Sequence, residues 1–333
     1  IHYAPINACI FPMAMLDGAW LLTVEDWAAE GGKLHPMQQA VVDHHGSQCG
    51  FCTPGFISTM IAGQLRQDSA SPETLMAGNL CRCTGYGGLI KAYEATKETA
   101  QPDWIKAQIR SAEKILPLLQ GGDFELKTEQ GTIYAPSTVT DFAAYRAENP
   151  DALIVAGATD VGLWITKRLD QPRKLLMTGF VQELKAITVS KEQIILGAAV
   201  TYEQAQDVLM EDFPEAQDWY DRLGSVQVRA SGTIGGNIAN GSPIGDSPPL
   251  LIALGAQLVL GGPQGPRFIA LEDFFLEYGK QDLAADEFVE AIIVPRRKRH
   301  QRLTVAKVSK RESQDITAVL AAVSETHTGT RMA

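Results

Sequence analysis

Cysteine is scarce in this sequence, with five residues among 333, which is too few for the disulfide framework of a secreted protein of this length. Basic residues are outnumbered as well, because 29 Lys and Arg stand against 39 Asp and Glu and give a net charge of −10. An acidic chain without a long basic run is a poor ligand for nucleic acid. We therefore expect no nucleic-acid partner.

The sequence also lacks a long uninterrupted hydrophobic run. The longest apolar stretch near its start, Ile10 to Leu22, contains Pro12 and Asp17, so we expect no membrane span. No signal-peptide pattern, internal repeat or low-complexity tract is present. What remains is a chain that is 45% hydrophobic and 20% charged, which can bury real cores, and its length predicts about two domains.

Residues 23–100 have the pattern of four short helices. Pro36 and Pro54 stand at early helical positions, and Ser71-Pro72-Glu73 combines an N-cap, a proline at the first helical position and an acidic first turn. The expected helices are Met37–His45, Gly55–Leu65, one that begins at Ser71, and Leu89–Ala100. Four short helices in so few residues predict a small bundle.

A second domain with strands and helices follows a stretch of mixed composition, which we interpret as a linker at residues 101–130. A buried strand, Leu153–Gly157, runs into a glycine turn and a helix that continues through Arg168. Further strands are expected at Gln193–Val200, Ala256–Gly261 and Phe288–Val294. The predicted fold is an α+β multidomain chain, a helical bundle followed by an α/β domain.

Both ends of the sequence have the pattern of incomplete domains. Ile1–Ala4 is strand-like, and the apolar run Thr317–Val323 resembles a strand with no partner behind it, followed by a polar turn, Ser324–Ala333. The chain is therefore expected to be cut at both ends from larger domains.

Four of the five cysteines form two close pairs. Cys49-Gly-Phe-Cys52 and Cys81-Arg-Cys83 both fall at junctions between expected helices, where loops can direct thiolates toward a common point. Four thiolates in one small bundle can hold zinc or an iron–sulfur cluster, and unligated or disulfide-forming thiols are the less favoured alternative. The tight Cys-x-Cys pair favours iron–sulfur over zinc and leaves both open.

Two glycine-containing loops lie in the second domain. Ile154–Asp160 is a strand followed by a glycine turn and a helix start, and Thr233–Asp246 combines paired glycines with Thr, Asn and Ser side chains. Neither loop has the Walker A or Gly-x-Gly-x-x-Gly pattern. Glycines allow close approach of the backbone, and short polar side chains supply hydrogen-bond donors, so the two loops together predict a diphosphate site.

The cysteine segments Gly46–Gly55 and Gly78–Tyr86 resemble the helical [2Fe–2S] domain of the molybdenum hydroxylases, the family of xanthine dehydrogenase, aldehyde oxidase and CO dehydrogenase. The resemblance implies that one [2Fe–2S] cluster is ligated by Cys49, Cys52, Cys81 and Cys83. It also implies that Gln48 faces the molybdopterin cofactor of a partner. In this family Asn7-Ala8-Cys9 would hold the last ligand, Cys9, of a second [2Fe–2S] cluster in a plant-type ferredoxin domain, whose other ligands would lie upstream.

The glycine loops resemble the PCMH-type FAD-binding domain of the same family. The FAD contacts implied by the resemblance are Ile154, Val155, Ala156, Gly157, Ala158, Thr159, Asp160, Val161, Thr233, Gly236, Asn237, Asn240, Ser242, Asp246, Val289 and Lys307. Two positions depart from the family pattern. Leu223 stands where an aromatic residue often packs on the flavin, and Asp160 stands where the acid is often Glu.

The form of the second loop is most similar to the xanthine dehydrogenase branch, and the resemblance divides the chain into five ranges. These are the end of a ferredoxin domain at 1–20, the helical [2Fe–2S] domain at 21–100, a linker at 101–130, the FAD-binding domain at 131–296, and the start of a further flavoprotein subdomain at 297–333. The resemblance assigns no catalytic residue to this chain. It implies a cytoplasmic electron-transfer subunit that passes electrons from a molybdenum site through [2Fe–2S] to FAD and NAD during oxidation of hypoxanthine and xanthine to urate.

The implied partner is a large molybdopterin-binding subunit, in an assembly of two small and two large subunits. One alternative is the same subunit of another molybdenum hydroxylase that acts on aldehydes or N-heterocycles. The non-enzymatic alternative is a zinc-stabilised interaction module joined to a nucleotide-binding domain.

Overall fold

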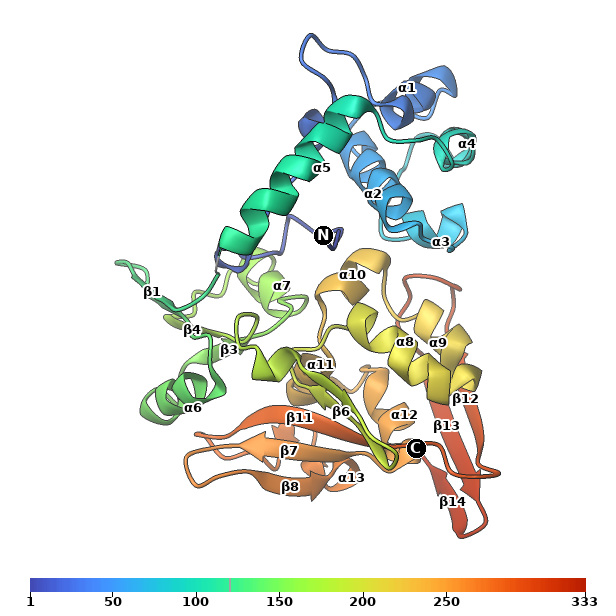
Figure 1. The fold of residues 1–333 in the computed structure, drawn as a ribbon. Coiled ribbons are helices and arrows are strands. Elements are labelled where there is room, and N and C mark those ends of the chain that lie inside the picture. Colours follow the sequence, from blue (N-terminus) through green and yellow to red (C-terminus); the bar gives the residue numbers. More distant parts are fainter. Residues whose placement is uncertain (120) are drawn as a thin grey trace. The chain divides into compact units, whose positions relative to one another are not determined.

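The computed structural model describes residues 1–119 and 121–333 and divides the chain into two compact units (Figure 1). The helical unit consists of Ile1–Ile6, Leu16–Gly121 and Gly224–Val228. The α/β unit consists of Asn7–Met15, Gly122–Leu223 and Arg229–Ala333. Two short segments, Asn7–Met15 and Gly224–Val228, therefore belong to a different unit from the residues on either side of them.

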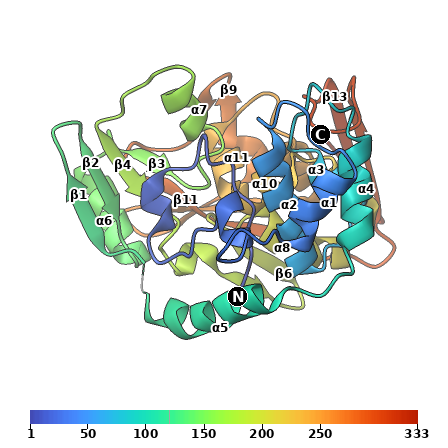
Figure 2. The same ribbon diagram turned by 90° about the horizontal axis from the view of Figure 1, so that it is seen from above.

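The helical unit contains the expected bundle. Its helices are α1 (Pro36–Asp43), α2 (Thr53–Arg66), α3 (Pro72–Met76), α4 (Gly87–Thr96) and α5 (Asp103–Ile115), with short 3₁₀ turns η2 (Val24–Trp27) and η3 (Leu116–Leu118). As predicted, Ser71 caps α3, because its hydroxyl accepts a hydrogen bond from the Thr74 N–H at 3.2 Å. The core includes Met37, Phe56, Met60 and Leu89, all fully buried, and Figure 2 shows α1, α2 and α4 lying together around it.

The stretch at residues 101–130, which we interpret as a linker, contains regular secondary structure. Its first half forms α5, in which Ile105 and Ile109 contact the core of the helical unit and Ala112 is buried. The Trp104 indole N–H also donates to the Trp27 carbonyl at 3.1 Å. The run Ile1–Ala4, which has a strand-like pattern in the sequence, has no regular secondary structure.

A four-stranded sheet opens the α/β unit. Its strands are β1 (Phe124–Lys127), β2 (Thr132–Ala135), β3 (Leu153–Val155) and β4 (Lys174–Met177), in the order β1-β2-β4-β3. β2 and β3 run parallel to β4, as expected when helices connect them. Helix α6 (Val139–Glu148) packs on this sheet through Phe142 and through Tyr145, which stacks on Tyr134 with ring centroids 4.4 Å apart (Figure 2). Helix α7 (Val161–Thr166) follows β3.

A five-stranded antiparallel sheet forms the larger part of the α/β unit. Its strands are β5 (Ile187–Val189), β6 (Gln193–Gly197), β7 (Gln257–Gly261), β8 (Arg267–Ala270) and β11 (Phe288–Pro295), in the order β5-β6-β11-β7-β8. The remaining elements are η1 (Met13–Leu16), η4 (Glu183–Lys185), η5 (Pro214–Ala216), α8 (Tyr202–Asp212), α9 (Gln217–Asp221), α10 (Val226–Ser231), α11 (Ile234–Asn240), α12 (Ser247–Leu254), α13 (Leu271–Phe274), β9 (Phe275–Glu277) and β10 (Lys280–Gln281). The main core lies between this sheet and its helices.

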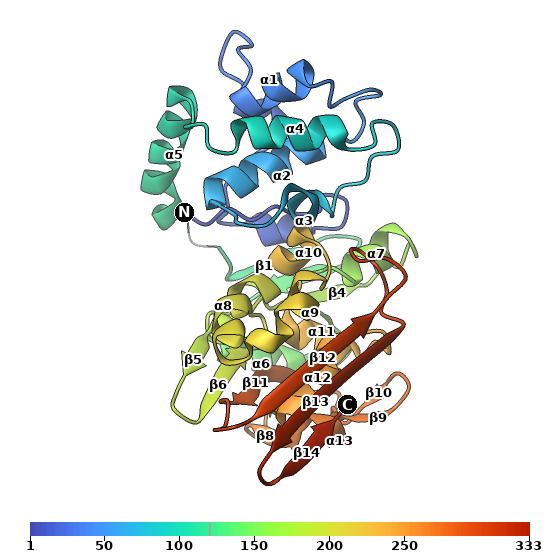
Figure 3. The same cartoon turned by 90° about the vertical axis from the view of Figure 1, so that its right-hand side faces the viewer.

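The C-terminal strand does have partners, so the prediction of an unpaired strand is wrong. β13 (Val319–Thr326) pairs with β12 (Arg302–Val308) on one side and with β14 (Gly329–Met332) on the other. The expected polar turn thus contains a two-residue reversal at His327-Thr328 and a short edge strand. Figure 3 shows this sheet beside α12. Within the described part of the chain, no helix is long and apolar enough to cross a membrane.

Candidate functional site: a cysteine centre and two glycine loops

The four paired cysteines all lie where helices begin or in the turns between them. Cys52 is the N-cap residue of α2, and Cys49 precedes it across Gly50, whose φ of 82° is accessible to glycine at little cost. Cys81 and Cys83 occupy the irregular segment between α3 and α4. The local sequence therefore places the four thiols on loops and helix starts that the helices fix in place.

The structure pairs the thiols across the two motifs. The Sγ atoms of Cys83 and Cys49 are 3.7 Å apart, much farther than the S–S bond of a disulfide at about 2 Å. The Cys52 and Cys81 thiols lie close enough for each to shift the pKa of the other. Among the residues that the structure describes, no three His, Cys, Asp or Glu side chains converge on one point that could hold a single metal ion.

Two thiol pairs fit a cluster of two irons, in which each iron takes two cysteine ligands, better than one tetrahedral zinc, which requires four convergent ligands. When bound, such a cluster carries single electrons.

The pairs differ in electrostatics. Hydrogen bonds to the sulfur from the Thr84 hydroxyl and backbone N–H lower the pKa of Cys81 to about 7. Burial raises the pKa of Cys52 to about 11, with a further contribution from the neighbouring Cys81 thiol. The neighbouring Cys49 thiol raises the pKa of Cys83. Cys81 is thus the thiol most readily converted to the thiolate that binds metal.

Two further residues that the resemblance singles out, Cys9 and Gln48, lie outside the group of four paired cysteines. Cys9 is exposed and belongs to the α/β unit, whereas the four paired cysteines belong to the helical unit. The predicted role of Cys9 in a second cluster stays a prediction. Gln48 is exposed next to Cys49.

The two glycine loops meet in the α/β unit. The first passes from β3 through Ala156, Gly157 and Ala158 to α7, and the second begins at Thr233, the N-cap of α11. The Thr233 hydroxyl accepts a hydrogen bond from the Gly236 N–H at 3.0 Å. The loops are joined by the Asn240 side-chain amide, which donates to the Asp160 carboxylate at 2.9 Å across 80 residues of sequence.

Gly157 makes this meeting possible. A Cβ atom at this position would lie 1.8 Å from the Ser231 carbonyl oxygen and 2.8 Å from the Gly232 Cα. The two loops therefore touch backbone to backbone, and no larger residue fits between them without displacing one loop.

Some polar side-chain atoms in and beside the loops make no hydrogen bond within the protein. The Asn237 Oδ1 atom is buried without a hydrogen-bond partner, as is the Ser231 hydroxyl. Burial raises the pKa of Asp160. Unsatisfied buried polar atoms beside glycines fit the polar part of a bound dinucleotide, and when bound FAD carries and transfers electron pairs.

A buried ion pair lies at the end of the second loop. Asp246 accepts hydrogen bonds from Lys307 Nζ and from the Thr317 hydroxyl, each at 2.6 Å. The Lys307 side chain is only 4% exposed and also donates to the Arg222 carbonyl at 3.1 Å. Lys307 is thus a buried, ion-paired lysine and not a solvated surface residue.

Most of the remaining predicted FAD contacts occupy the first loop and its ends, with Ser242 in the second loop. Ile154 and Val155 are in β3, Ala156–Asp160 form the turn, and Val161 begins α7. Ser242 follows α11, and its hydroxyl accepts from the Ile244 N–H at 3.4 Å.

Val289 and Leu223 are placed differently from the polar loop residues. Both are buried in the main core together with Ile234 and Ile238 of α11. Their packing against α11 helps to fix the position of the second loop.

Two residues of these sites were not predicted from the sequence. Thr84 stands within the quoted Cys-Arg-Cys-Thr motif, so its spacing of three from Cys81 was a usable signal. Thr317 bonds to Asp246 from 71 residues away, and no local pattern indicates it.

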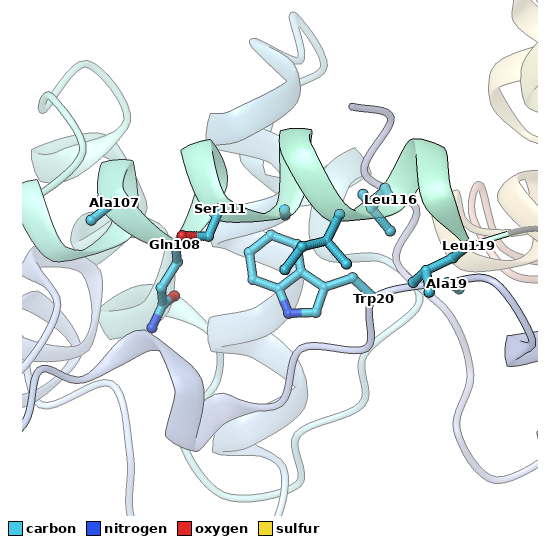
Figure 4. Close-up of a pocket in the computed structure, with 9 residues that line it drawn as sticks. Ala19, Trp20, Ala107, Gln108, Ser111, Leu116 and Leu119 are labelled. Atoms are coloured by element: carbon cyan, nitrogen blue, oxygen red, sulfur yellow. The ribbon is translucent and has the colours of Figure 1, made fainter.

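The helical unit also contains an apolar cavity of about 440 Å³ between the Ala19-Trp20 segment and α5. Figure 4 shows the Trp20 indole beside α5, with Leu116 and Leu119 nearby. The lining is mostly apolar and contains no charged side chain, so the cavity does not suit a charged diphosphate.

A helical unit with paired thiols and an α/β unit with two joined glycine loops define a redox protein class that combines a [2Fe–2S]-binding domain with an FAD-binding domain. Two family models agree. Residues 23–94 match a "[2Fe-2S] binding domain", and residues 125–297, more than half of the chain, match the "FAD binding domain in molybdopterin dehydrogenase". The chain belongs to this family, the molybdenum hydroxylases.

The curated relatives include the xanthine dehydrogenase of Drosophila pseudoobscura pseudoobscura, 30% identical over 97% of this chain and 28% of the relative. Xanthine dehydrogenase 2 of Arabidopsis thaliana is 29% identical over 96% of this chain and 29% of the relative. The chain thus spans less than a third of the length of these relatives.

Among solved structures, the carbon monoxide dehydrogenase of Hydrogenophaga pseudoflava is similar with a TM-score of 0.57 and 26% identity, over 63% of this chain and 74% of that chain. Quinoline 2-oxidoreductase from Pseudomonas putida 86 follows with a TM-score of 0.55 and 25% identity, over 62% and 74%.

Proposed function

We propose that this chain is the electron-transfer part of an NAD-dependent xanthine dehydrogenase. The observation that carries the proposal is the alignment of nearly the whole chain with xanthine dehydrogenases, through both cofactor domains in sequence. A partner molybdopterin-binding subunit would oxidise hypoxanthine and xanthine to urate with oxygen from water, and NAD⁺ would take up the electron pair. The assembly would contain two copies of each subunit and act in the cytoplasm.

The residues of this chain would bind and position the two carriers. Cys49, Cys52, Cys81 and Cys83 would ligate the cluster, and Thr84 would hold Cys81 as thiolate. Gly157 and Gly236 would let the backbone approach the FAD diphosphate, while Asn237 Oδ1 and the Asp160 carboxylate would accept hydrogen bonds from hydroxyl or N–H groups elsewhere on FAD.

The Asp246–Lys307 pair would hold the end of the same loop in place. The remaining predicted contacts would support the flavin from β3 and the turn after it, from α11 and the second loop, and from β11.

The test is purification of the assembled enzyme followed by assays with xanthine, hypoxanthine, aldehydes and quinoline, with NAD⁺ as acceptor. Purine turnover coupled to NADH formation, with about equal amounts of FAD and chain, is the expected result. Turnover of quinoline or aldehydes without purines would assign the chain to another molybdenum hydroxylase, a possibility raised by the similarity to quinoline 2-oxidoreductase. A colourless protein with stoichiometric zinc would instead identify an interaction module.

A further inference from the structure

The segment Gly224–Val228 belongs to the helical unit although the residues on both sides of it belong to the α/β unit. Val226 is 5% exposed and lies in the core of the helical unit with Phe56 and Leu75. Ser225 and Gln227 are equally buried, at 2% and 4% exposed. Val226, which precedes the predicted flavin contact Thr233 by seven residues, thus completes the core around the cysteine centre, with Ser225 and Gln227 buried beside it.

Gln227 bonds to the helix that begins at Cys52. Its side-chain amide donates to the Thr59 hydroxyl at 2.9 Å, across 168 residues of sequence. Thr59 is 3% exposed and lies on α2, two turns after Cys52. The same hydroxyl accepts a second hydrogen bond, at 3.0 Å, from the side chain of Asn79, which stands two residues before Cys81. One buried oxygen therefore joins Gln227, the helix of Cys52 and the loop of Cys81.

Gly78 shows how closely the segment fits against that loop. A Cβ atom at this position would lie 2.0 Å from Gln227 Oε1 and 2.7 Å from the Ser225 Cβ, so the space is filled. Gln227 Oε1 is itself buried with no hydrogen-bond partner. A methionine or leucine would fill a purely apolar space without leaving a polar atom unsatisfied, so packing alone does not account for a glutamine here.

We propose that Gln227 is a positioning residue for the [2Fe–2S] cluster and acts through Thr59 and Asn79 on the Cys81–Cys83 loop. The inference rests on ligation of the cluster by the four paired cysteines. The redox potential of an iron–sulfur cluster depends on hydrogen bonds to its sulfurs and on its exposure to solvent, and both follow from how this loop lies against α2. Gln227 thereby makes the environment of the cluster dependent on the segment that leads into the second glycine loop.

The test is Gln227→Met in the assembled enzyme, with Gln38→Met as the matched control. Gln38 is 8% exposed, lies in the helical unit, and makes two hydrogen bonds, to the Val24 carbonyl and from the His35 N–H. The readouts are the midpoint potential and the electron paramagnetic resonance spectrum of the chemically reduced clusters, bound iron, and the melting temperature.

We expect Gln227→Met to shift the midpoint potential and the g values of one [2Fe–2S] signal. We expect Gln38→Met to lower the melting temperature and to leave the midpoint potential and the g values unchanged. A Gln227→Met enzyme that melts earlier but keeps the wild-type potential and spectrum overturns the proposal, because its role is then only structural.

Thr59 supplies a second test if Gln227→Met does not fold. Thr59→Ser keeps the acceptor oxygen and should retain the wild-type signal, whereas Thr59→Val removes it and should shift the signal. Identical signals in the two variants overturn the proposal. Since chemical reduction needs no substrate, these readouts do not depend on whether the enzyme oxidises purines.

Discussion

The two cofactor sites differ in how far apart their residues lie along the sequence. The four paired cysteines occupy one short stretch, and turns at helix ends bring them together, so their ligand chemistry is visible in the side-chain types themselves. The glycine loops lie 80 residues apart at the Asp160–Asn240 contact, and they meet only because two parts of the α/β fold come together. A local site depends on a few side chains, whereas a site formed by distant loops depends on the backbone that supports it.

Removing a ligand should break the local site completely. Cys81→Ser is expected to abolish the cluster of the four paired cysteines, because the thiol with the lowered pKa is lost and alkoxide is a poor replacement. The measurement is bound iron and the reduced-cluster resonance signal. Cys9→Ser is the control and should leave this particular signal intact. Survival of the signal in Cys81→Ser would show that the ligand set is wrong.

The buried ion pair at the end of the second loop gives the next largest effect. Lys307→Met leaves the Asp246 carboxylate buried without its cation, which is expected to lower the free energy of unfolding by about 3–5 kcal/mol. The exposed neighbour Lys310 is the control, because Lys310→Met should change it by less than about 0.5 kcal/mol. Chemical denaturation measures both. Equal effects would mean that the pair does not stabilise this region.

The backbone contact between the loops is tested by Gly157→Ala. The added Cβ would overlap the Ser231 carbonyl, so we expect a loss of about 1–3 kcal/mol and a lower FAD content. Gly179→Ala is the matched control, since a Cβ there meets nothing within 4 Å. Thermal unfolding and the flavin-to-protein ratio distinguish the two. A Gly157→Ala protein with normal flavin content would contradict a role for this close approach.

The smallest effect concerns an ion pair away from both sites. Glu287 accepts two hydrogen bonds from Arg267, at 2.9 and 2.8 Å, which lower the pKa of this carboxyl. A lowered pKa in the folded state stabilises the protein above the unfolded value of about 4.3 and the benefit disappears as the pH falls through the folded value.

Glu287→Gln should therefore cost about 1 kcal/mol at pH 7, because Arg267 is partly exposed, and less near pH 3. Urea midpoints at the two pH values measure this, with the exposed Glu129→Gln as control. A cost that does not change with pH would assign the effect to packing.

The elements with strong local signals could be predicted from sequence. The four helices of the bundle, their proline and serine starts, and the strands β3, β6, β7 and β11 appear near the expected residues because capping and hydrophobic periodicity are local. Helix α5 was missed because the mixed composition of its stretch was interpreted as a linker, although Ile105, Ile109 and Ala112 recur at helical spacing. β14 was missed because a short exposed edge strand has no hydrophobic pattern.

The sequence by itself determined the chemistry of this protein: four thiols in two close pairs, and two glycine loops with short polar side chains. Only the tertiary structure decided which thiols pair, that Asn240 bonds to Asp160, and that Lys307 is buried against Asp246. It also decided that Gln227, far along the chain, shares a hydroxyl with the loop of Cys81. The physical reason is that residue type and spacing fix local geometry, whereas contacts across many residues depend on how complete elements pack.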